Sequence, residues 1–167
     1  AISGPTLFRV DPVGASGPDA GGVQAVQGPT TLLNLQYSGI ELVQLSSDFD
    51  DDLEIYEDLG DNAWTLQAGP VVGMEAARVL IDDRSPIDFS AFVTATLINL
   101  GGEDHFTVNP DRLPAGTAYT VRGLVSLVDG SIHDTLTVMG TGFGDTVTVT
   151  NTDVTLGVPI AYQNMAL

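Results

Sequence analysis

The feature that most restricts the fold is the spacing of the apolar residues, which recur at every second position far more often than at helical spacing. Alternation of this kind, rich in β-branched residues, is typical of strands that bury one face. Residues 72–81 could form a helix or a strand, because 74–80 also fits helical spacing. We predict an all-β chain with strands at 32–37, 40–45, 53–56, 92–100, 106–108, 119–128, 135–138, 146–150 and 154–160.

The length of 167 residues suits a single domain, and a hydrophobic content of 43% is too high for a disordered chain. The first part of the chain differs, because Gly, Pro and small residues surround one short apolar piece, Leu7, Phe8, Arg9 and Val10. We interpret residues 1–29 as an extended arm or linker and residues 30–167 as the all-β domain. If residues 7–10 are ordered, they must pair with a sheet edge of their own chain or of a neighbour.

Charge and cysteine content exclude several classes of protein. The chain has 22 acidic and five basic residues, a net charge of −17 and no cysteine. This negative field repels phosphate backbones and anionic lipids, so we expect neither nucleic-acid binding nor membrane insertion. The lack of cysteine excludes disulfides, zinc–thiolate sites and thiol nucleophiles. Because the chain begins with Ala1, we interpret it as a mature or excised form. We expect it to be extracellular or at the cell surface, with a virion as the alternative location.

An acidic turn followed by an alternating strand recurs in the sequence. It occurs at residues 50–55, 102–108, 133–138 and 144–149, and residues 37–42 are echoed by 162–167. Stacking of such units would align Asp52, Asp104, Asp134 and Asp145 in a ladder that needs cations or water between its charges. The spacing of the copies is uneven. The fold class is therefore either a β-solenoid-like repeat stack or a β-sandwich, in both cases with the extended amino-terminal arm.

Residues 30–55 and 97–167 resemble the degenerate β-repeats of large bacterial secreted and cell-surface proteins. The units of that family are similar to Gly-Thr-x-x-x-Asp-Thr-Val-Thr-Val, which residues 140–149 match, and to Tyr-x-Gly-Ile-Glu-x-Leu, which residues 37–43 match except for Val43 in place of the last Leu. These repeats are distantly similar to calcium-binding nonapeptide repeats, although this chain lacks the strict Gly-Gly-x-Gly-x-Asp signature. The resemblance implies stacked strands around a continuous core, and it favours calcium only weakly.

One dense group of acidic residues is the candidate metal site. Its oxygen-only ligands suit a hard cation, so we expect calcium as the cofactor. Alternate positions provide carboxylates as in a calcium loop, but the Gly and the distal Glu of an EF-hand are missing, and a solvated acidic loop is the alternative. The predicted ligands are Asp48, Asp50, Asp51, Asp52 and Glu54.

No pattern predicts an enzyme. His105 and His133 each stand beside an Asp, but no nucleophile motif accompanies them. The acidic residues Asp82, Asp83 and Asp88 could pair as in sugar hydrolysis, yet acidic pairs are common in so acidic a chain. Trp64 and Tyr56 could stack on a glycan, although such aromatic residues more often lie in a core.

We therefore expect a non-catalytic structural module of an extracellular filament, adhesin or surface layer. Its partners would be copies of itself, joined head to tail when residues Leu7, Phe8, Arg9 and Val10 of one copy complete the sheet of the next. The alternatives are a virion decoration or tail protein and a carbohydrate-binding module. A glycan partner has no motif in its support.

Overall fold

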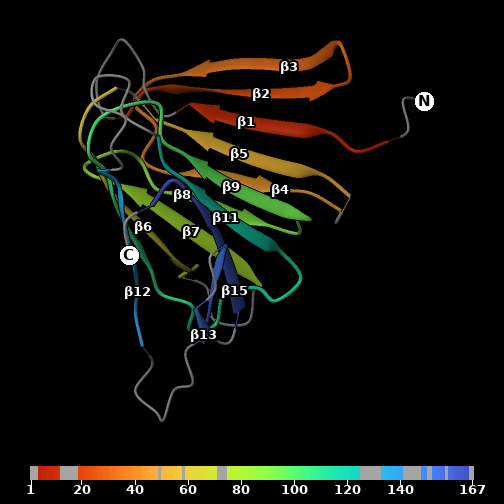
Figure 1. Cartoon of the computed structure of the whole chain (residues 1–167). Coiled ribbons are helices and arrows are strands. Elements are labelled where there is room, and N and C mark those ends of the chain that lie inside the picture. Colours follow the sequence, from red (N-terminus) through yellow and green to blue (C-terminus); the bar gives the residue numbers. More distant parts are fainter. Residues whose placement is uncertain are drawn as a thin grey trace.

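The computed structural model describes residues 4–11, 19–48, 50–57, 59–70, 75–124, 133–140, 148–149, 152–156 and 158–165. Within these residues every regular element is a strand (Figure 1), which confirms the all-β prediction. The strands form two mixed sheets that do not close into a barrel. Residues 76–81, which could also have been helical, are a strand with alternating buried positions.

The larger sheet has nine strands in the order β13-β14-β15-β11-β9-β5-β1-β2-β3. Five neighbouring strands in its middle, from β15 to β1, run parallel to one another, and antiparallel strands extend the sheet at both ends. The strands are β1 (Leu7–Asp11), β2 (Gly21–Gln27), β3 (Thr30–Tyr37), β5 (Asp52–Tyr56), β9 (Thr94–Ile98), β11 (Ala118–Arg122), β13 (Thr148–Val149), β14 (Asp153–Leu156) and β15 (Val158–Gln163).

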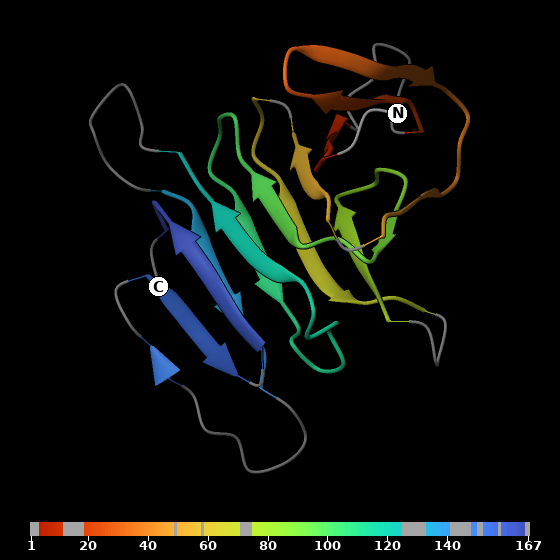
Figure 2. The same cartoon turned by 90° about the vertical axis from the view of Figure 1, so that its right-hand side faces the viewer.

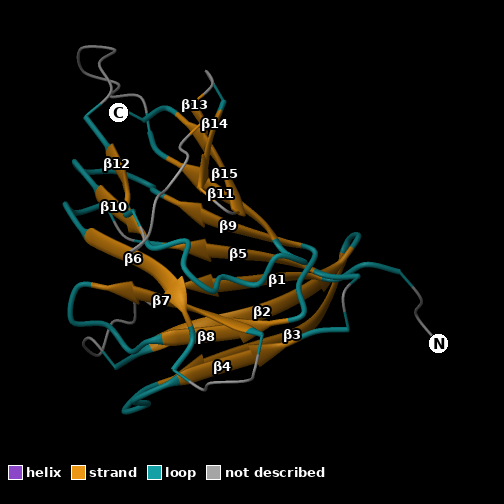
Figure 3. Ribbon diagram, turned by 90° about the horizontal axis from the view of Figure 1, so that it is seen from below, coloured by secondary structure: helices purple, strands orange, loops and turns teal. Residues whose placement is uncertain are grey.

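The smaller sheet has the order β12-β10-β6-β7-β8-β4 and lies against the larger one as a second layer (Figure 3). The chain alternates between the layers from β9 to β12, so each pass adds one parallel strand to each sheet. Of the two predicted architectures, this two-layer arrangement is consistent with the β-sandwich. The strands are β4 (Val43–Ser46), β6 (Ala63–Ala68), β7 (Ala76–Ile81), β8 (Ile87–Ser90), β10 (His105–Val108) and β12 (Thr135–Val138).

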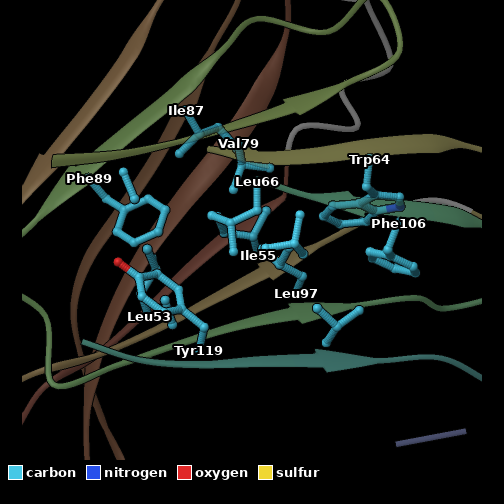
Figure 4. Close-up of a cluster of buried hydrophobic side chains, with 14 of the residues drawn as sticks. Leu53, Ile55, Trp64, Leu66, Val79, Ile87, Phe89, Leu97, Phe106 and Tyr119 are labelled. Carbon is cyan, nitrogen blue, oxygen red and sulfur yellow. The ribbon is translucent and has the colours of Figure 1, made fainter. Parts of the chain in front are cut away.

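The core lies between the two sheets and is formed by the alternating apolar residues (Figure 4). Leu53 and Ile55 of β5 are fully buried from one side, and Trp64 and Leu66 of β6 are almost fully buried from the other. The rings of Trp64 and Phe106 stack with centroids 5.0 Å apart. Each such side chain stabilises the fold by about 1.5–3 kcal/mol through burial, which explains why the period of two determines the fold.

The amino-terminal region differs from the expected arm. Strand β1 lies inside the larger sheet, where it pairs with β2 on one side and with β5 on the other. Strands β2 and β3 then pair along their length across the boundary that we expected after residue 29, through a turn in which Gly28 has a φ of 55°. Strand β2 was not predicted because it contains several small residues. Val23 and Ala25 are buried. At Gly21 a Cβ would lie 2.5 Å from the Asp11 carbonyl oxygen, so this position has no room for a side chain.

Some predicted elements are only partly described. Residues 125–128 of one predicted strand, residues 146, 147 and 150 of another, and Asp145 of the predicted ladder lie outside the described residues. The predicted strand at 154–160 is two strands, β14 and β15, which pair antiparallel.

Candidate functional site

The predicted metal ligands Asp48, Asp50 and Asp51 lie together in the loop that leads into β5. Each can place one carboxylate oxygen within 4.8 Å of the others. Asp48 and Asp50 are exposed, and Asp51 is partly buried. The neighbouring carboxylates raise the pKa of Asp50 to about 6, chiefly through a hydrogen bond with Asp48. A proton or a cation would therefore relieve the repulsion within this group.

The other two predicted ligands point elsewhere. Asp52 accepts a hydrogen bond from Thr94 Oγ1 at 2.5 Å, and Glu54 accepts hydrogen bonds from Arg9 Nε and the Tyr56 hydroxyl. Asp51 itself is also held by the fold, because its carboxylate accepts hydrogen bonds from the backbone N–H of Thr6 at 2.7 Å and from Ser47 Oγ at 2.8 Å. The five predicted ligands are thus divided, and binding of calcium by the remaining three stays a prediction.

A second group of polar residues is buried at the beginning of three parallel strands. Asn62, Asp104 and Asp134 directly precede β6, β10 and β12, which pair in register. The backbone N–H of Asn62 donates to Asp104 Oδ1 at 2.7 Å, and the N–H of Asp104 donates to Asp134 Oδ1 at 2.9 Å. We call these three residues the carboxyl stack. Asp104 and Asp134 are the two members of the predicted ladder that the structure brings together.

Asp134 is the best-satisfied member of the carboxyl stack. It is fully buried, and its two oxygens accept further hydrogen bonds from Asn99 Nδ2 at 2.9 Å and from the backbone N–H of Leu124 at 2.7 Å. Donors of this kind replace the water that a buried carboxylate loses. Asp134 therefore connects the beginning of β10 with the segments that directly follow β9 and β11.

Asp104 has a less favourable environment. Burial is the largest cause that raises its pKa to about 6, and the charge of Asp134 acts in the same direction. Hydrogen bonds from the N–H of Asn62 and with Glu57 act in the opposite direction. Glu57 is also buried, with only 1% of its surface exposed. The carboxyl stack thus combines a structural role with sensitivity to protons in the range near pH 6.

The residues considered for catalysis or glycan stacking are mostly engaged in the fold. His105 Nδ1 lies 2.7 Å from Thr135 Oγ1, and Asp88 forms a bidentate pair with Arg78 at 2.6 and 2.8 Å. Asp82 accepts a hydrogen bond from the N–H of Ala63 at 2.9 Å. Trp64 is 1% exposed, so it cannot stack on a glycan, because burial in the core removes both ring faces from solvent.

The residues predicted to assemble with a neighbour, Leu7, Phe8, Arg9 and Val10, belong to a strand that is paired on both sides within the chain. Val10 is fully buried, and the Phe8 ring packs edge-on against Phe92 at 5.5 Å. Their backbone groups are therefore occupied. Of the two pairings that the sequence left open, the structure has the one within the chain.

The edges of the sheets lie at other strands. Among the described residues, β3 and β13 end the larger sheet, and β4 and β12 end the smaller one (Figure 2). None of these four strands contains a charged residue, although the chain has 22 acidic and five basic residues. On β3, Leu32, Leu33 and Leu35 are each between 45% and 50% exposed.

Comparisons with known proteins give no relative: no family model, no curated protein and no solved structure matches the chain. In the described part of the chain, no helix is long and apolar enough to cross a membrane.

Proposed function

We propose that this chain is a structural module of an extracellular filament, adhesin or surface layer, and that copies of it assemble through the open edges of their sheets. The observation that supports this proposal best is the composition of β3, an edge strand of eight residues without a charge and with three exposed leucines. Proteins that remain monomeric usually protect such edges with charged residues, Pro or a covering segment. An uncharged edge strand with exposed leucines favours a partner strand.

The positions of the edges favour a head-to-tail arrangement. Strands β3 and β4 end the two sheets on one side of the stacking order, and β13 and β12 end them on the other. Pairing of one side with the other in the next copy would continue both layers of the sandwich. Contacts between two different surfaces do not close on themselves unless a ring forms, so they build filaments or arrays.

Electrostatics makes this assembly dependent on salt. A net charge of −17 on each copy opposes association at long range. Ions screen this repulsion over about 10 Å at 0.1 M salt, while the uncharged edge strands keep like charges away from the contact itself. Assembly should therefore strengthen as the ionic strength rises.

The test compares two variants that add the same charge at different places. Leu33→Lys places a charge on the β3 edge, and Leu59→Lys places it at a residue that is 76% exposed and outside every strand. Both variants lower the net negative charge, so repulsion alone predicts stronger association for both. Sedimentation velocity should show assembly of the wild type and of Leu59→Lys but only monomers of Leu33→Lys. Equal assembly of all three would contradict the role of the edge.

A mixing experiment distinguishes head-to-tail from symmetric contact. Thr137→Lys alters the opposite side of the molecule, at an exposed position of β12, which ends the smaller sheet. If contact is head to tail, each variant alone stays monomeric, whereas the mixture of Leu33→Lys and Thr137→Lys forms dimers and stops there. If Thr137→Lys dimerises alone, the contact is between two identical edges.

A further inference from the structure

A groove lies on the outer face of the larger sheet, where β1, β2, β3 and β5 run side by side (Figure 1). It has a volume of about 260 Å³, and its lining includes Arg9, Gly22, Gln24, Gln36 and Tyr56. The register of the strands explains why these residues lie together. Gln24, Arg9 and Glu54 follow one another across the strands, and Gln36 pairs with Gly22 in the adjacent outward-facing row.

Glu54 connects two of the groups on one side of the groove. Its Oε2 accepts hydrogen bonds from Arg9 Nε at 3.2 Å and from the Tyr56 hydroxyl. The guanidinium group and the phenol hydroxyl thus share one carboxylate acceptor across neighbouring strands. This contact reduces the number of orientations that the two groups adopt before a ligand binds.

The other side of the groove offers unused hydrogen-bonding groups. Within the described part of the chain, the side-chain amides of Gln24 and Gln36 form no hydrogen bond with protein, and Arg9 bonds only through its Nε. An amide both donates and accepts, and a guanidinium donates through several N–H groups. These groups match a ligand in which each oxygen can donate and accept.

Gly22 forms part of the floor of the groove. A Cβ at this position would lie 2.7 Å from Gln36 Nε2, so the glycine allows the amide to lie close to the backbone of β2. The rim includes Leu100, which is 44% exposed, and the Tyr56 ring is partly buried. The groove thus presents an apolar contact beside its polar groups.

The charges and the size of the groove restrict the class of ligand. Arg9 is balanced by Glu54, Asp11 adds a further carboxylate to the lining, and the net charge of −17 repels anions. A volume of 260 Å³ is slightly below the range of pockets for drug-sized molecules. We propose that this groove binds one neutral sugar unit of a glycan, with its hydroxyl groups on Gln24, Gln36 and Arg9. The groove reaches the edge strand β3 through Gln36, but it lies on the outward face of the sheet, whereas the proposed assembly would use the backbone edge of that strand.

The test is a titration of the ¹⁵N-labelled full chain with D-glucose, D-galactose and D-mannose, followed by NMR. Sugar concentrations up to about 50 mM cover the weak affinity expected for a single unit. At least one sugar should shift the side-chain amides of Gln24 and Gln36 and the backbone amide of Gly22 in a saturable way. Gln24→Ala should weaken this binding about tenfold, the loss expected for one or two hydrogen bonds. Gln44→Ala, at an exposed amide of β4 in the other sheet, should leave it unchanged.

Three results would overturn the proposal. The first is that no sugar shifts these amides, and the second is that Gln24→Ala and Gln44→Ala bind equally well. The third is that D-glucuronate, which adds a carboxylate to the glucose ring, binds more tightly than D-glucose. Gly22→Ala gives an independent variant, because the added methyl group should displace Gln36 and weaken binding without removing a polar group.

Discussion

The carboxyl stack and strand β3 reverse the usual distribution of polar and apolar residues. Asp104 and Asp134 are charged side chains in the interior, whereas Leu33 and Leu35 are apolar side chains in contact with solvent. The difference between the two regions lies in their partners. Each buried carboxylate accepts hydrogen bonds from the backbone of neighbouring segments, while no described strand lies beyond β3 and its leucines stay 45–50% exposed. The comparison supports a stabilising role of the stack within one copy, and it agrees with the proposal that the β3 edge contacts another copy.

The largest effect on stability should come from Asp134→Ala. This change removes the acceptor of Asn99, of the Asp104 N–H and of the Leu124 N–H, all close to the core. Leaving these donors without a partner should cost about 3 kcal/mol or more of unfolding free energy. Urea unfolding of the monomer measures this loss. Asp111→Ala, at an exposed turn, should cost less than about 0.5 kcal/mol, and similar losses in both variants would contradict the structural role of the stack.

A smaller effect should appear in the pH dependence of stability. The pKa of Asp104 is about 6 in the folded chain, above its ordinary value of 3.8, because burial disfavours the charged form. Protonation therefore favours the folded state: the contribution of Asp104 is greatest below pH 4 and is lost as the pH rises through 6. Acidification from pH 7.5 to 5.5 should raise the unfolding free energy, with an effect on the order of 1 kcal/mol.

Asp104→Asn isolates this contribution. The amide is neutral at every pH and has nearly the same shape, and Asn62 already occupies the equivalent position one strand away. The general relief of charge repulsion at lower pH acts on both proteins, so the difference between their urea midpoints reports Asp104 alone. That difference should shrink as the pH falls. A difference that is constant between pH 7.5 and 5.5 would show that Asp104 does not titrate there.

An effect of similar size should come from calcium at the exposed acidic loop, which belongs to neither of the two compared regions. A cation held by Asp48, Asp50 and Asp51 would stabilise the folded state by mass action, by about 1 kcal/mol at concentrations several times its Kd. Calcium in the millimolar range should therefore raise the melting temperature by a few degrees, and magnesium should raise it less. Asp50→Asn should reduce the calcium effect. Identical melting curves in chelator and in calcium would contradict calcium binding by this loop.

Much of the fold could be predicted from the sequence, because its cause is local. Alternation of large apolar residues identifies strands such as β5 and β12 without knowledge of their neighbours. The acidic turns before β10 and β12 were also visible, and the structure stacks Asp104 on Asp134. The position of β1 was open, since pairing with its own sheet or with another depends on distant parts of the chain.

Other features depended on tertiary contacts that a local pattern does not contain. Strand β2 contains Gly21, Gly22 and Ala25, so it lacks the alternation of large apolar residues that predicts a strand buried on one face. The predicted ladder does not include Asn62, because this position has an amide where the recurring acidic turn has Asp, although residues 61–66 have the same turn and alternation as 103–108. The division of the predicted metal ligands arises because Glu54 lies on a strand beside Arg9 and Tyr56, whereas Asp50 lies in the preceding loop.

Hydrogen exchange at β3 tests the central claim of edge pairing most directly. In a single copy, the β3 amides that face away from β2 have no strand partner, because β3 ends the described sheet. If copies join through this edge, these amides should become protected as the protein concentration rises, while the amides of the inner strand β5 keep their protection. Association without any change in the exchange of the outward-facing β3 amides would contradict assembly through this strand.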